Sequence, residues 1–572
     1  MDPLIKGLFK DFRESFELEM MSESDAFELF AATLILPSGL LGQTEISDLL
    51  LDPGTLGVDV ALLEINGELI TSAHDIDAAC QNKRSLDVAV HLLQTKSSTS
   101  VESAEILNFG NTARMILENR LPPQFSKLRD LSAALHRIFD DYAGKLEDRP
   151  SVNLSFVTTA SEASLSDRIA LDRVEDVKRS IGELGFVGDV KFALYGSKGL
   201  YEAARRRNQA NRADIILEKS INLPKMPDID QAILGVVTIS ELLKLIRDDD
   251  GSLDEPVFYD NVRGFKGNDN PVNLQISETL ASPERALLPV LNNGVTVVAT
   301  SYSPKPGDAV TLSGYQIVNG CQTSHCIHLA ASEMGADVSD SVYVPLRIVV
   351  TENQDIATRI IRATNSQTAV SDSDLLALTN FQKRLEEYYQ QDQLSVGLTY
   401  ERRSGQFYFK AVTRTRIVTI SEQMRAVAAT FLNLPHLAAR YPQHLYEEVG
   451  GREVFREEHR LAPYVASAYA AYRLETAFKG SLEADYKPIR YHLLMAYKYH
   501  ILGGHSAQLN QRSIDSQSMQ LVESLKSNDC VNTFRAVATK IVELAGGQMP
   551  TRDRLKGARF THEVVAAFAR GA

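Results

Sequence analysis

Two neighbouring stretches, GVDVALLEINGELIT at residues 57–71 and VAVHLLQTK at residues 88–96, decide the fold of the first part of the chain. Both are short runs of β-branched and aliphatic residues, which is typical of buried strands. Asn66-Gly67 has the composition of a tight hairpin turn. Residues 8–34 and 101–121 instead have the apolar spacing of helices, with Ser24 and Asp25 as expected caps inside the first segment. The order helix, paired strands, strand and helix predicts an α/β fold.

Polar residues stand at the ends of these two predicted strands. Asp59 is near the start of the first, and Gln94 and Lys96 end the second. Alternate residues of a strand face the same side, so Gln94 and Lys96 are expected to share one face. Antiparallel pairing of the two strands would bring Asp59 beside them. A carboxylate for Mg²⁺, a metal-activated water and a nearby cation are what phosphodiester hydrolysis requires.

This pattern resembles the PD-(D/E)xK restriction-endonuclease-like superfamily, in the branch that has Gln in place of the second acid. The matching pieces are Gly57-Val58-Asp59, Gln94-Thr95-Lys96 and a preceding helix with Phe27-Glu28. The resemblance implies a metal-dependent endonuclease that uses Mg²⁺, with Mn²⁺ as a substitute.

The resemblance also implies a role for each matching residue. Asp59 would be the main metal ligand, joined by the Gln94 amide oxygen and the Thr95 backbone carbonyl. Lys96 would orient water or stabilise the transition state, and Glu28 would be an additional acid. The alternative is that Asp59 and Lys96 are charged residues at solvated strand ends, without a catalytic role. A Gln-x-Lys tripeptide alone is weak evidence for a site, because it occurs by chance about once in a chain of this length.

A second distinctive stretch is the polar block at residues 291–367. It contains two Asn-Gly pairs, each beside a β-rich run, which predict tight turns with positive φ. Its amide and hydroxyl side chains suit hydrogen-bond recognition of a ligand or a buried polar network. The candidate ligand-binding residues are Asn319, Gln322, Thr323, Asn365 and Gln367. Cys321 and His325 would share a helix face, but no acid nearby in sequence orients the histidine, so a catalytic thiol is the weaker alternative.

This block resembles the abortive infection phage resistance (AIPR) family. The matching pieces are NVRG at residues 261–264, NNG at 292–294, QIVNGCQT at 316–323, TNSQ at 364–367 and YERR at 400–403. Members often begin with a nuclease-like region, as this chain does. The resemblance implies a bacterial antiphage role.

Five basic residues surround an aromatic triplet at residues 407–409. They suit a strand pair that contacts phosphate, or a solvated strand face. They are Arg402, Arg403, Lys410, Arg414 and Arg416.

Composition limits the function classes. The net charge of −14 argues against a protein that coats nucleic acid without specificity, although a local basic channel is still compatible with a nuclease. Four cysteines in 572 residues match neither a disulfide framework nor a zinc pattern, so a reducing cytoplasm is expected. We find no signal peptide and no apolar run of about 18 residues, and therefore expect no membrane partner.

Together these observations predict an α/β multidomain protein of four parts. They are a restriction-endonuclease-like domain (residues 1–146), an α/β connecting segment (147–226), an α/β AIPR core (227–420) and a helical C-terminal region (421–572). The expected function is antiphage defence by a Mg²⁺-dependent nuclease that cleaves DNA. The alternative is a noncatalytic sensor of DNA or a partner with a degenerate nuclease fold. A second copy of the chain and an activating signal of phage or nucleotide origin are further partners that the sequence leaves open.

Overall fold

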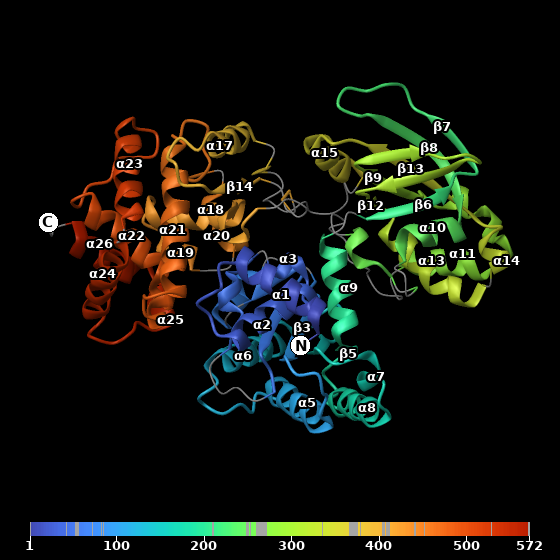
Figure 1. Cartoon of the computed structure of the whole chain (residues 1–572), viewed down its shortest axis with the longest axis horizontal. Helices are drawn as coiled ribbons and strands as arrows, with labels where there is room; N and C mark the ends of the chain where they lie inside the picture. The colour runs from blue at the N-terminus through green and yellow to red at the C-terminus, as the bar shows by residue number, and fades with distance from the viewer. Residues whose placement is uncertain are drawn as a thin grey trace. The chain divides into compact units, whose positions relative to one another are not determined.

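The computed structural model describes residues 2–41, 43–51, 57–70, 73–81, 83, 85–208, 211–247, 251, 253–258, 271–334, 336–364, 376–377, 379–402, 406–407, 412–439, 442–450, 452–527 and 529–569. The chain forms two compact units, drawn in Figure 1. Unit 1 combines both ends of the chain, residues 1–205 and 372–572, and unit 2 consists of residues 206–371. The four-part division expected from the sequence has different boundaries from these units and stays a prediction.

The N-terminal part of unit 1 is built on a five-stranded sheet with the order β2-β1-β3-β4-β5. β1 pairs antiparallel with β2 and β3, whereas β3, β4 and β5 are parallel. Asn66 and Gly67 have φ angles of 53° and 83°, which confirms the predicted hairpin turn. The strands are β1 (Val60–Ile65), β2 (Glu68–Ile70), β3 (Val88–Lys96), β4 (Ser151–Thr158) and β5 (Val190–Tyr195).

Helices cover both faces of this sheet. α1 and α2 pack on the face that carries Leu62 and Leu93, and α5, α6 and α8 pack on the face that carries Leu63 and Leu92. The α/β fold predicted for this region is therefore confirmed. The helices are α1 (Pro3–Ser15), α2 (Glu23–Ile35), α3 (Ser38–Leu41), α4 (Ile76–Cys80), α5 (Ser103–Leu117), α6 (Ser126–Tyr142), α7 (Glu162–Leu165), α8 (Arg168–Gly182) and α9 (Ser197–Asn208).

The start of α2 differs from the expectation. Ser22, and not Ser24 or Asp25, is the N-cap, and its hydroxyl accepts a hydrogen bond from the Asp25 backbone N–H at 3.1 Å. The chain turns before this cap at Glu17, which has a φ of +51°. The apolar spacing continues across the turn because α1 and α2 bury residues in one shared core.

Unit 2 contains a mixed five-stranded sheet, β12-β9-β13-β8-β7, and a three-stranded sheet, β10-β11-β6. Helices α10 and α13 pack against the larger sheet. The strands are β6 (Arg212–Ile216), β7 (Lys219–Asn222), β8 (Gln231–Thr238), β9 (Val295–Ala299), β10 (Ser301–Pro304), β11 (Ala309–Ser313), β12 (Gln316–Asn319) and β13 (Tyr343–Val350). The helices are α10 (Ile239–Ile246), α11 (Pro271–Ala281), α12 (Leu288–Leu291), α13 (Cys321–Met334), α14 (Ala336–Ser339) and α15 (Gln354–Thr364).

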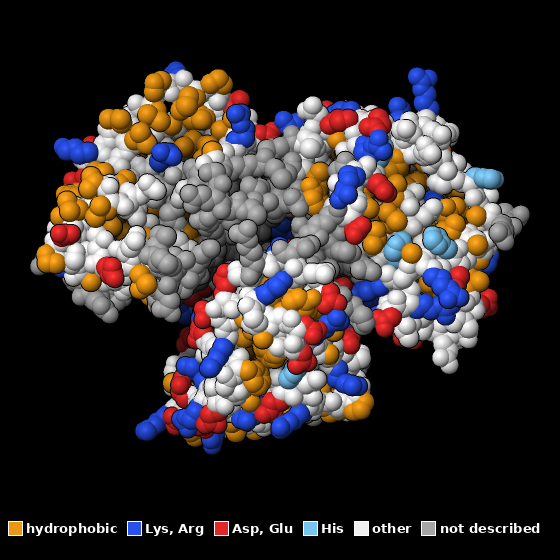
Figure 2. Space-filling model, turned by 180° about the vertical axis from the view of Figure 1, so that it is seen from behind, with side chains coloured by type: hydrophobic (Ala, Val, Ile, Leu, Met, Phe, Trp, Pro, Cys, Tyr) orange, Lys and Arg blue, Asp and Glu red, His pale blue; other side chains and the backbone are white. Residues whose placement is uncertain are grey.

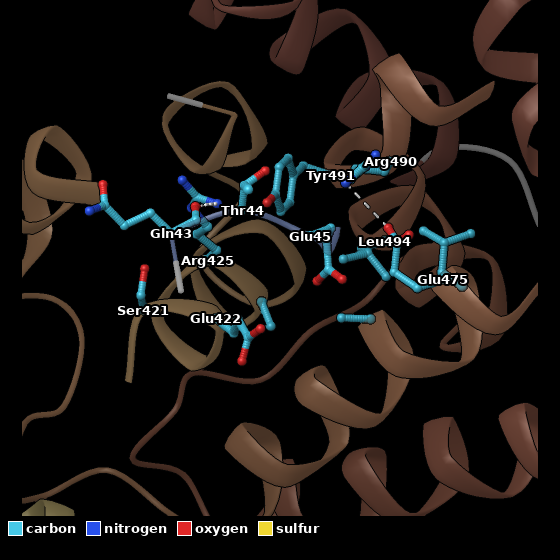
Figure 3. Close-up of a pocket in the computed structure, with 13 residues that line it drawn as sticks. Gln43, Thr44, Glu45, Ser421, Glu422, Arg425, Glu475, Arg490, Tyr491 and Leu494 are labelled. Atoms are coloured by element: carbon cyan, nitrogen blue, oxygen red, sulfur yellow. Dashed lines mark hydrogen bonds and ion pairs between the residues drawn. The ribbon is translucent and has the colours of Figure 1, made fainter. Parts of the chain in front are cut away.

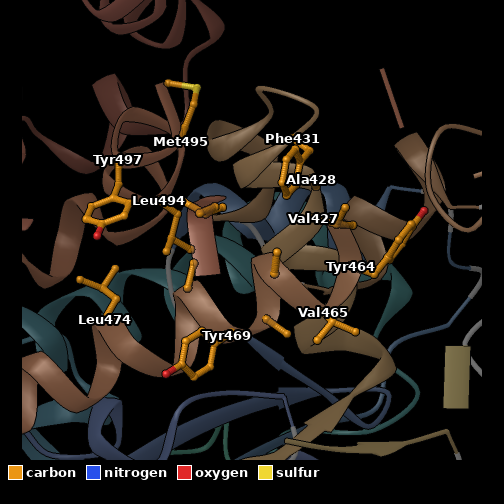
Figure 4. Close-up of a cluster of buried hydrophobic side chains, with 14 of the residues drawn as sticks. Val427, Ala428, Phe431, Tyr464, Val465, Tyr469, Leu474, Leu494, Met495 and Tyr497 are labelled. Carbon is orange, nitrogen blue, oxygen red and sulfur yellow. The ribbon is translucent and has the colours of Figure 1, made fainter. Parts of the chain in front are cut away.

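The C-terminal part of unit 1 is helical, as expected, apart from the short parallel pair β14 (Thr399–Glu401) and β15 (Ile417–Thr419). Apolar side chains of α18, α21 and α22 form its core, and Figure 4 shows Val427, Val465 and Leu494 among them. The helices are α17 (Asn380–Gln391), α18 (Ile420–Thr430), α19 (Pro435–Ala438), α20 (Pro442–Val449), α21 (Ala462–Lys479), α22 (Arg490–Ile501), α23 (Ser513–Lys526), α24 (Cys530–Leu544), α25 (Arg552–Leu555) and α26 (Ala558–Ala569). None of the described helices is long and apolar enough to cross a membrane.

Lys498 of α22 is fully buried in the helical core, with an exposed fraction of 0%. Its ammonium group donates to the Asn433 side-chain oxygen at 3.2 Å and lies 3.7 Å from the centre of the Tyr499 ring. Burial lowers the pKa of Lys498 to about 7, because the apolar surroundings disfavour the charged form. The folded protein therefore binds this proton less tightly than the unfolded chain does.

We predict that Lys498→Met stabilises the protein at pH 7 and that the gain shrinks as the pH rises. Between the folded pKa near 7 and the unfolded pKa near 10.5, the unfolded wild type holds the additional proton, so wild-type stability rises with pH. The difference between variant and wild type should fall by about 1.4 kcal/mol per pH unit in this window. Urea denaturation of both proteins from pH 7 to pH 9 measures it. A stability difference that stays constant with pH would show that folding does not lower the pKa of Lys498.

Candidate functional site

The candidate site lies where β1 begins and β3 ends, and comprises Glu28, Asp59, Gln94, Thr95 and Lys96. The Asp59 backbone N–H donates to the Leu93 carbonyl at 2.8 Å, which extends the β1–β3 pairing by one residue. The Asp59 carboxylate oxygen Oδ2 accepts two hydrogen bonds from Thr95, from the backbone N–H at 2.6 Å and from the hydroxyl at 3.0 Å. The start of β1 and the end of β3 therefore lie side by side, as expected from the sequence.

Gly57 lies two residues before Asp59, where the chain passes close to α5. Its φ is +74°, and a Cβ at this position would lie 3.0 Å from the Asn108 carbonyl and 3.1 Å from the Phe109 nitrogen of α5. A residue with a side chain would be strained by its backbone angle and crowded by this helix. The glycine of the Gly57-Val58-Asp59 motif therefore permits the close passage of the strand entry along α5.

Gln94 is an unusual residue for a strand interior. Its exposed fraction is 4%, and among the described residues no hydrogen-bond donor reaches its side-chain oxygen Oε1. A buried polar atom without a partner costs about 1–3 kcal/mol, so such atoms are uncommon unless another group binds them. Gln94 thus presents an amide oxygen that is available to a cation or a donor.

Lys96 is the last residue of β3 and has the same side-chain direction along the strand as Gln94. Its ammonium nitrogen lies 3.1 Å from a carboxylate oxygen of Glu105, in the first turn of α5. Glu105 is not among the site residues that the sequence predicts. Acidic residues are favoured in the first turn of any helix, so its sequence position carries no distinguishing signal.

The two acids of the site influence each other. The pKa of Glu28 is raised to about 8, by burial first and then by the charges of Asp59 and Asp25, against the lowering effect of Lys96. The pKa of Asp59 is also raised by burial, although the Thr95 hydrogen bonds and Lys96 oppose the shift. The raised pKa favours the protonated form of Glu28 at neutral pH, and a cation nearby would favour its ionisation.

No group of three His, Cys, Asp or Glu side chains among the described residues is arranged to hold a metal ion. The predicted ligand set does not need such a group, because it combines the Asp59 carboxylate with two neutral oxygens, those of the Gln94 amide and the Thr95 carbonyl. Oxygen donors of this type suit Mg²⁺. The buried Oε1 of Gln94 is the observation in favour of the fit.

The polar block of unit 2 is organised around Asn292. Its side-chain oxygen accepts hydrogen bonds from the Gly294 backbone N–H at 2.8 Å and from the Thr323 hydroxyl at 3.1 Å. The predicted turns are present, since Gly294 and Gly320 have φ angles of +73° and +92°. A Cβ at Gly294 would lie 2.2 Å from the Pro345 carbonyl, so only glycine fits there. Thr323 is buried, and its hydroxyl is used in the hydrogen bond to Asn292, which is a structural contact.

The other candidate ligand residues divide between described and undescribed positions. Asn319 ends β12, Gln322 lies in the first turn of α13, and both are partly exposed. Asn365 and Gln367 lie outside the described residues. Cys321 is buried, and burial, followed by the charge of His328, lowers the pKa of His325 to about 4. A histidine that is neutral at pH 7 does not supply the positive charge that would activate a thiol.

The basic cluster has intramolecular partners. Arg402 is 5% exposed, with its Nε 2.7 Å from a Glu386 oxygen and its NH1 donating to the Ala377 carbonyl. Arg414 donates to the Phe407 carbonyl at 3.2 Å. Arg416 lies 3.7 Å from Glu17 and 5.0 Å from the centre of the Tyr472 ring. Arg403 and Lys410 lie outside the described residues. The burial of Arg402 and its bonds to Glu386 and Ala377 favour a structural role, and its contact with phosphate stays a prediction.

Figure 2 shows one face of the N-terminal domain, lowest in that view. Acidic and basic side chains alternate across it, without a continuous basic surface among its described residues. On this face, a nucleic-acid partner would have to be recognised through individual charges.

Comparison with known proteins supports the identification of the central block. A model of the AIPR protein family matches residues 258–544, just over half of the 572-residue chain. No curated protein and no solved structure matches the chain.

We predict that Asn292→Ala lowers the melting temperature by several degrees, whereas Gln322→Ala leaves it nearly unchanged. The first change removes the acceptor of two hydrogen bonds and leaves two donors without it, at about 1–3 kcal/mol each. The second changes a partly exposed side chain. Thermal unfolding of both variants beside wild type measures the difference. A large fall for Gln322→Ala would assign that residue to the structural network and not to ligand recognition.

Proposed function

The chain belongs to the AIPR family, the abortive infection proteins of phage defence, and from that premise we propose that its N-terminal domain is a Mg²⁺-dependent nuclease that cleaves DNA. The observation that carries the proposal is the buried Gln94 oxygen without a hydrogen-bond partner, beside the hydrogen-bonded pair of Asp59 and Thr95. Neither a solvated strand end nor a packed apolar strand accounts for that arrangement.

The order of elements also supports the proposal. Glu28 is on α2, which precedes the strand of Asp59, and Gln94-Thr95-Lys96 ends the strand paired with it. This is the order implied by the resemblance to the PD-(D/E)xK superfamily. The noncatalytic sensor remains the second candidate, and it is favoured by the double hydrogen bond that Thr95 makes to one oxygen of Asp59.

Asp59, Gln94 and the Thr95 carbonyl would hold the metal ion, which when bound supplies positive charge at the scissile phosphate and lowers the pKa of a bound water. The other residues act through charge and proton position. Lys96 stabilises negative charge on the phosphate, and Glu105 limits the directions in which its ammonium group points. The raised pKa of Glu28 favours a protonated carboxyl group at this place in the site.

We predict that Lys96→Ala lowers the DNA cleavage rate by about 10²–10³, the usual loss for one electrostatic stabiliser. The melting temperature should barely change, because Lys96 is a partly exposed strand end. The matched control is Lys83→Ala, since Lys83 is also paired with a glutamate and is 39% exposed against 36% for Lys96. Rates are measured on plasmid, linear and single-stranded DNA and on RNA, with Mg²⁺, Mn²⁺ or EDTA. A wild type without EDTA-sensitive cleavage would establish the noncatalytic alternative.

Glu105→Gln should lower the rate by about two- to fivefold, the effect of losing a partly exposed ion pair worth about 0.5–1 kcal/mol. The control is Glu102→Gln, which removes the same charge from the N-cap of the same helix. In a Lys96→Ala background, Glu105→Gln should have no further effect, because the residue that it orients is gone. Additive losses in the double variant would mean that Glu105 acts independently of Lys96.

A further inference from the structure

Helix α2, which carries Glu28, is bracketed by two segments that contact the C-terminal helices of unit 1. The first segment, Phe16 and Glu17, precedes the helix, and the second, residues 43–48, follows it. Both sets of contacts are made by side chains from the other end of the chain.

The contacts before α2 are polar. Lys479 of α21 donates to the Phe16 carbonyl at 2.9 Å. The Glu17 carboxylate accepts from the Thr415 hydroxyl at 2.8 Å and from the Tyr472 hydroxyl at 3.2 Å. These bonds fix the turn from which α2 starts.

The contacts after α2 centre on Arg490, the first residue of α22. Its NH1 and NH2 groups each lie 2.7 Å from a different oxygen of Asp48, the bidentate geometry of a strong ion pair. Burial acts to raise the pKa of Asp48, but the guanidinium charge and hydrogen bonds outweigh it, so the pKa lies below its usual value. Glu475 lies 3.5 Å from Arg490, and Lys487 donates to the Ser47 hydroxyl at 3.1 Å.

A cavity of about 40 Å³ lies at the same joint, room for about three water molecules. Figure 3 shows Glu45 facing into it across from Arg490 and Glu475, with Arg425 beside Gln43. Arg425 donates to the Gln43 carbonyl at 3.2 Å. The joint is therefore held by directional charged groups around a small cavity, unlike the apolar layer under α2.

The apolar layer holds α2 to the sheet through Ala26, Phe27, Leu29 and Phe30. Apolar packing is non-directional, so the hydrogen bonds at the two ends add the constraint on rotation and sliding of the helix. Glu28 lies in the middle of α2, and its position relative to Asp59 follows from that of the helix.

The C-terminal partners Thr415, Tyr472, Lys479 and Arg490 all fall within the family-matched segment 258–544, whereas α2 does not. We propose that the family-matched helices act as a clamp that fixes α2 and so sets the position of Glu28 at the candidate site, with Arg490 as the main positioning residue. The catalytic consequence rests on the proposed nuclease function; the clamp itself does not.

Hydrogen–deuterium exchange of the full-length protein tests the clamp. Asp48→Asn removes the charge that Arg490 binds, and amides of residues 23–35 should then exchange about tenfold faster, the loss expected for one charged hydrogen bond. The matched control is Asp515→Asn, because Asp515 pairs with Arg460 among the C-terminal helices and is 31% exposed against 34% for Asp48. The control should leave exchange in α2 unchanged.

A second variant, Glu17→Gln, weakens the contacts at the other end of α2 and should also speed exchange there, which keeps the test valid if Asp48→Asn fails to fold. Equal exchange in α2 for wild type, Asp48→Asn and Glu17→Gln overturns the clamp, whether or not the protein cleaves DNA. If the wild type cleaves, Asp48→Asn should lower kcat and leave KM unchanged, because the change displaces Glu28 and leaves the other residues of the candidate site in place. A wild type that does not cleave refutes the nuclease function and leaves the exchange result to decide the clamp.

Discussion

The antiparallel pairing of β1 with β3 is the constraint on which the N-terminal domain depends. Val60 pairs with Leu93, and this register determines which residue stands opposite each strand end. A slip by one residue would turn every side chain of one strand to the other face. It would also separate Asp59 from Thr95, whose backbone N–H and hydroxyl both donate to the Asp59 carboxylate.

Local features of this domain were predictable because their causes are local. The Asn66-Gly67 turn fixes the hairpin, and the apolar runs fix the strands. The closeness of Asp59 to Thr95 follows from the antiparallel pairing, which in this register places the start of β1 beside the end of β3. The cap of α2 was misplaced by two residues because Ser22, Ser24 and Asp25 are all good capping residues, and the turn at Glu17 decides between them.

Other features have no signal in a single sequence. Glu105 looks like any acid in the first turn of a helix. Arg402 looks like part of a surface cluster until its burial beside Glu386 is known. The pair of Asp48 and Arg490 joins residues 442 positions apart, a separation over which no periodicity or motif carries information. The contact between Asp48 and Arg490 becomes visible only in the folded structure, where the two ends of the chain meet.

The discontinuous build of unit 1 has a consequence for biosynthesis. A ribosome adds about 5–20 residues per second, so roughly 20–90 seconds pass between the synthesis of Asp48 and that of Arg490. Once Lys96 has been added, and until Arg490 is added, the nascent chain contains every residue of the candidate site but not the partner of Asp48. Termination of translation between residues 96 and 490 leaves the chain in that same condition. The order of synthesis thus separates the presence of the site residues from the completion of the scaffold around α2.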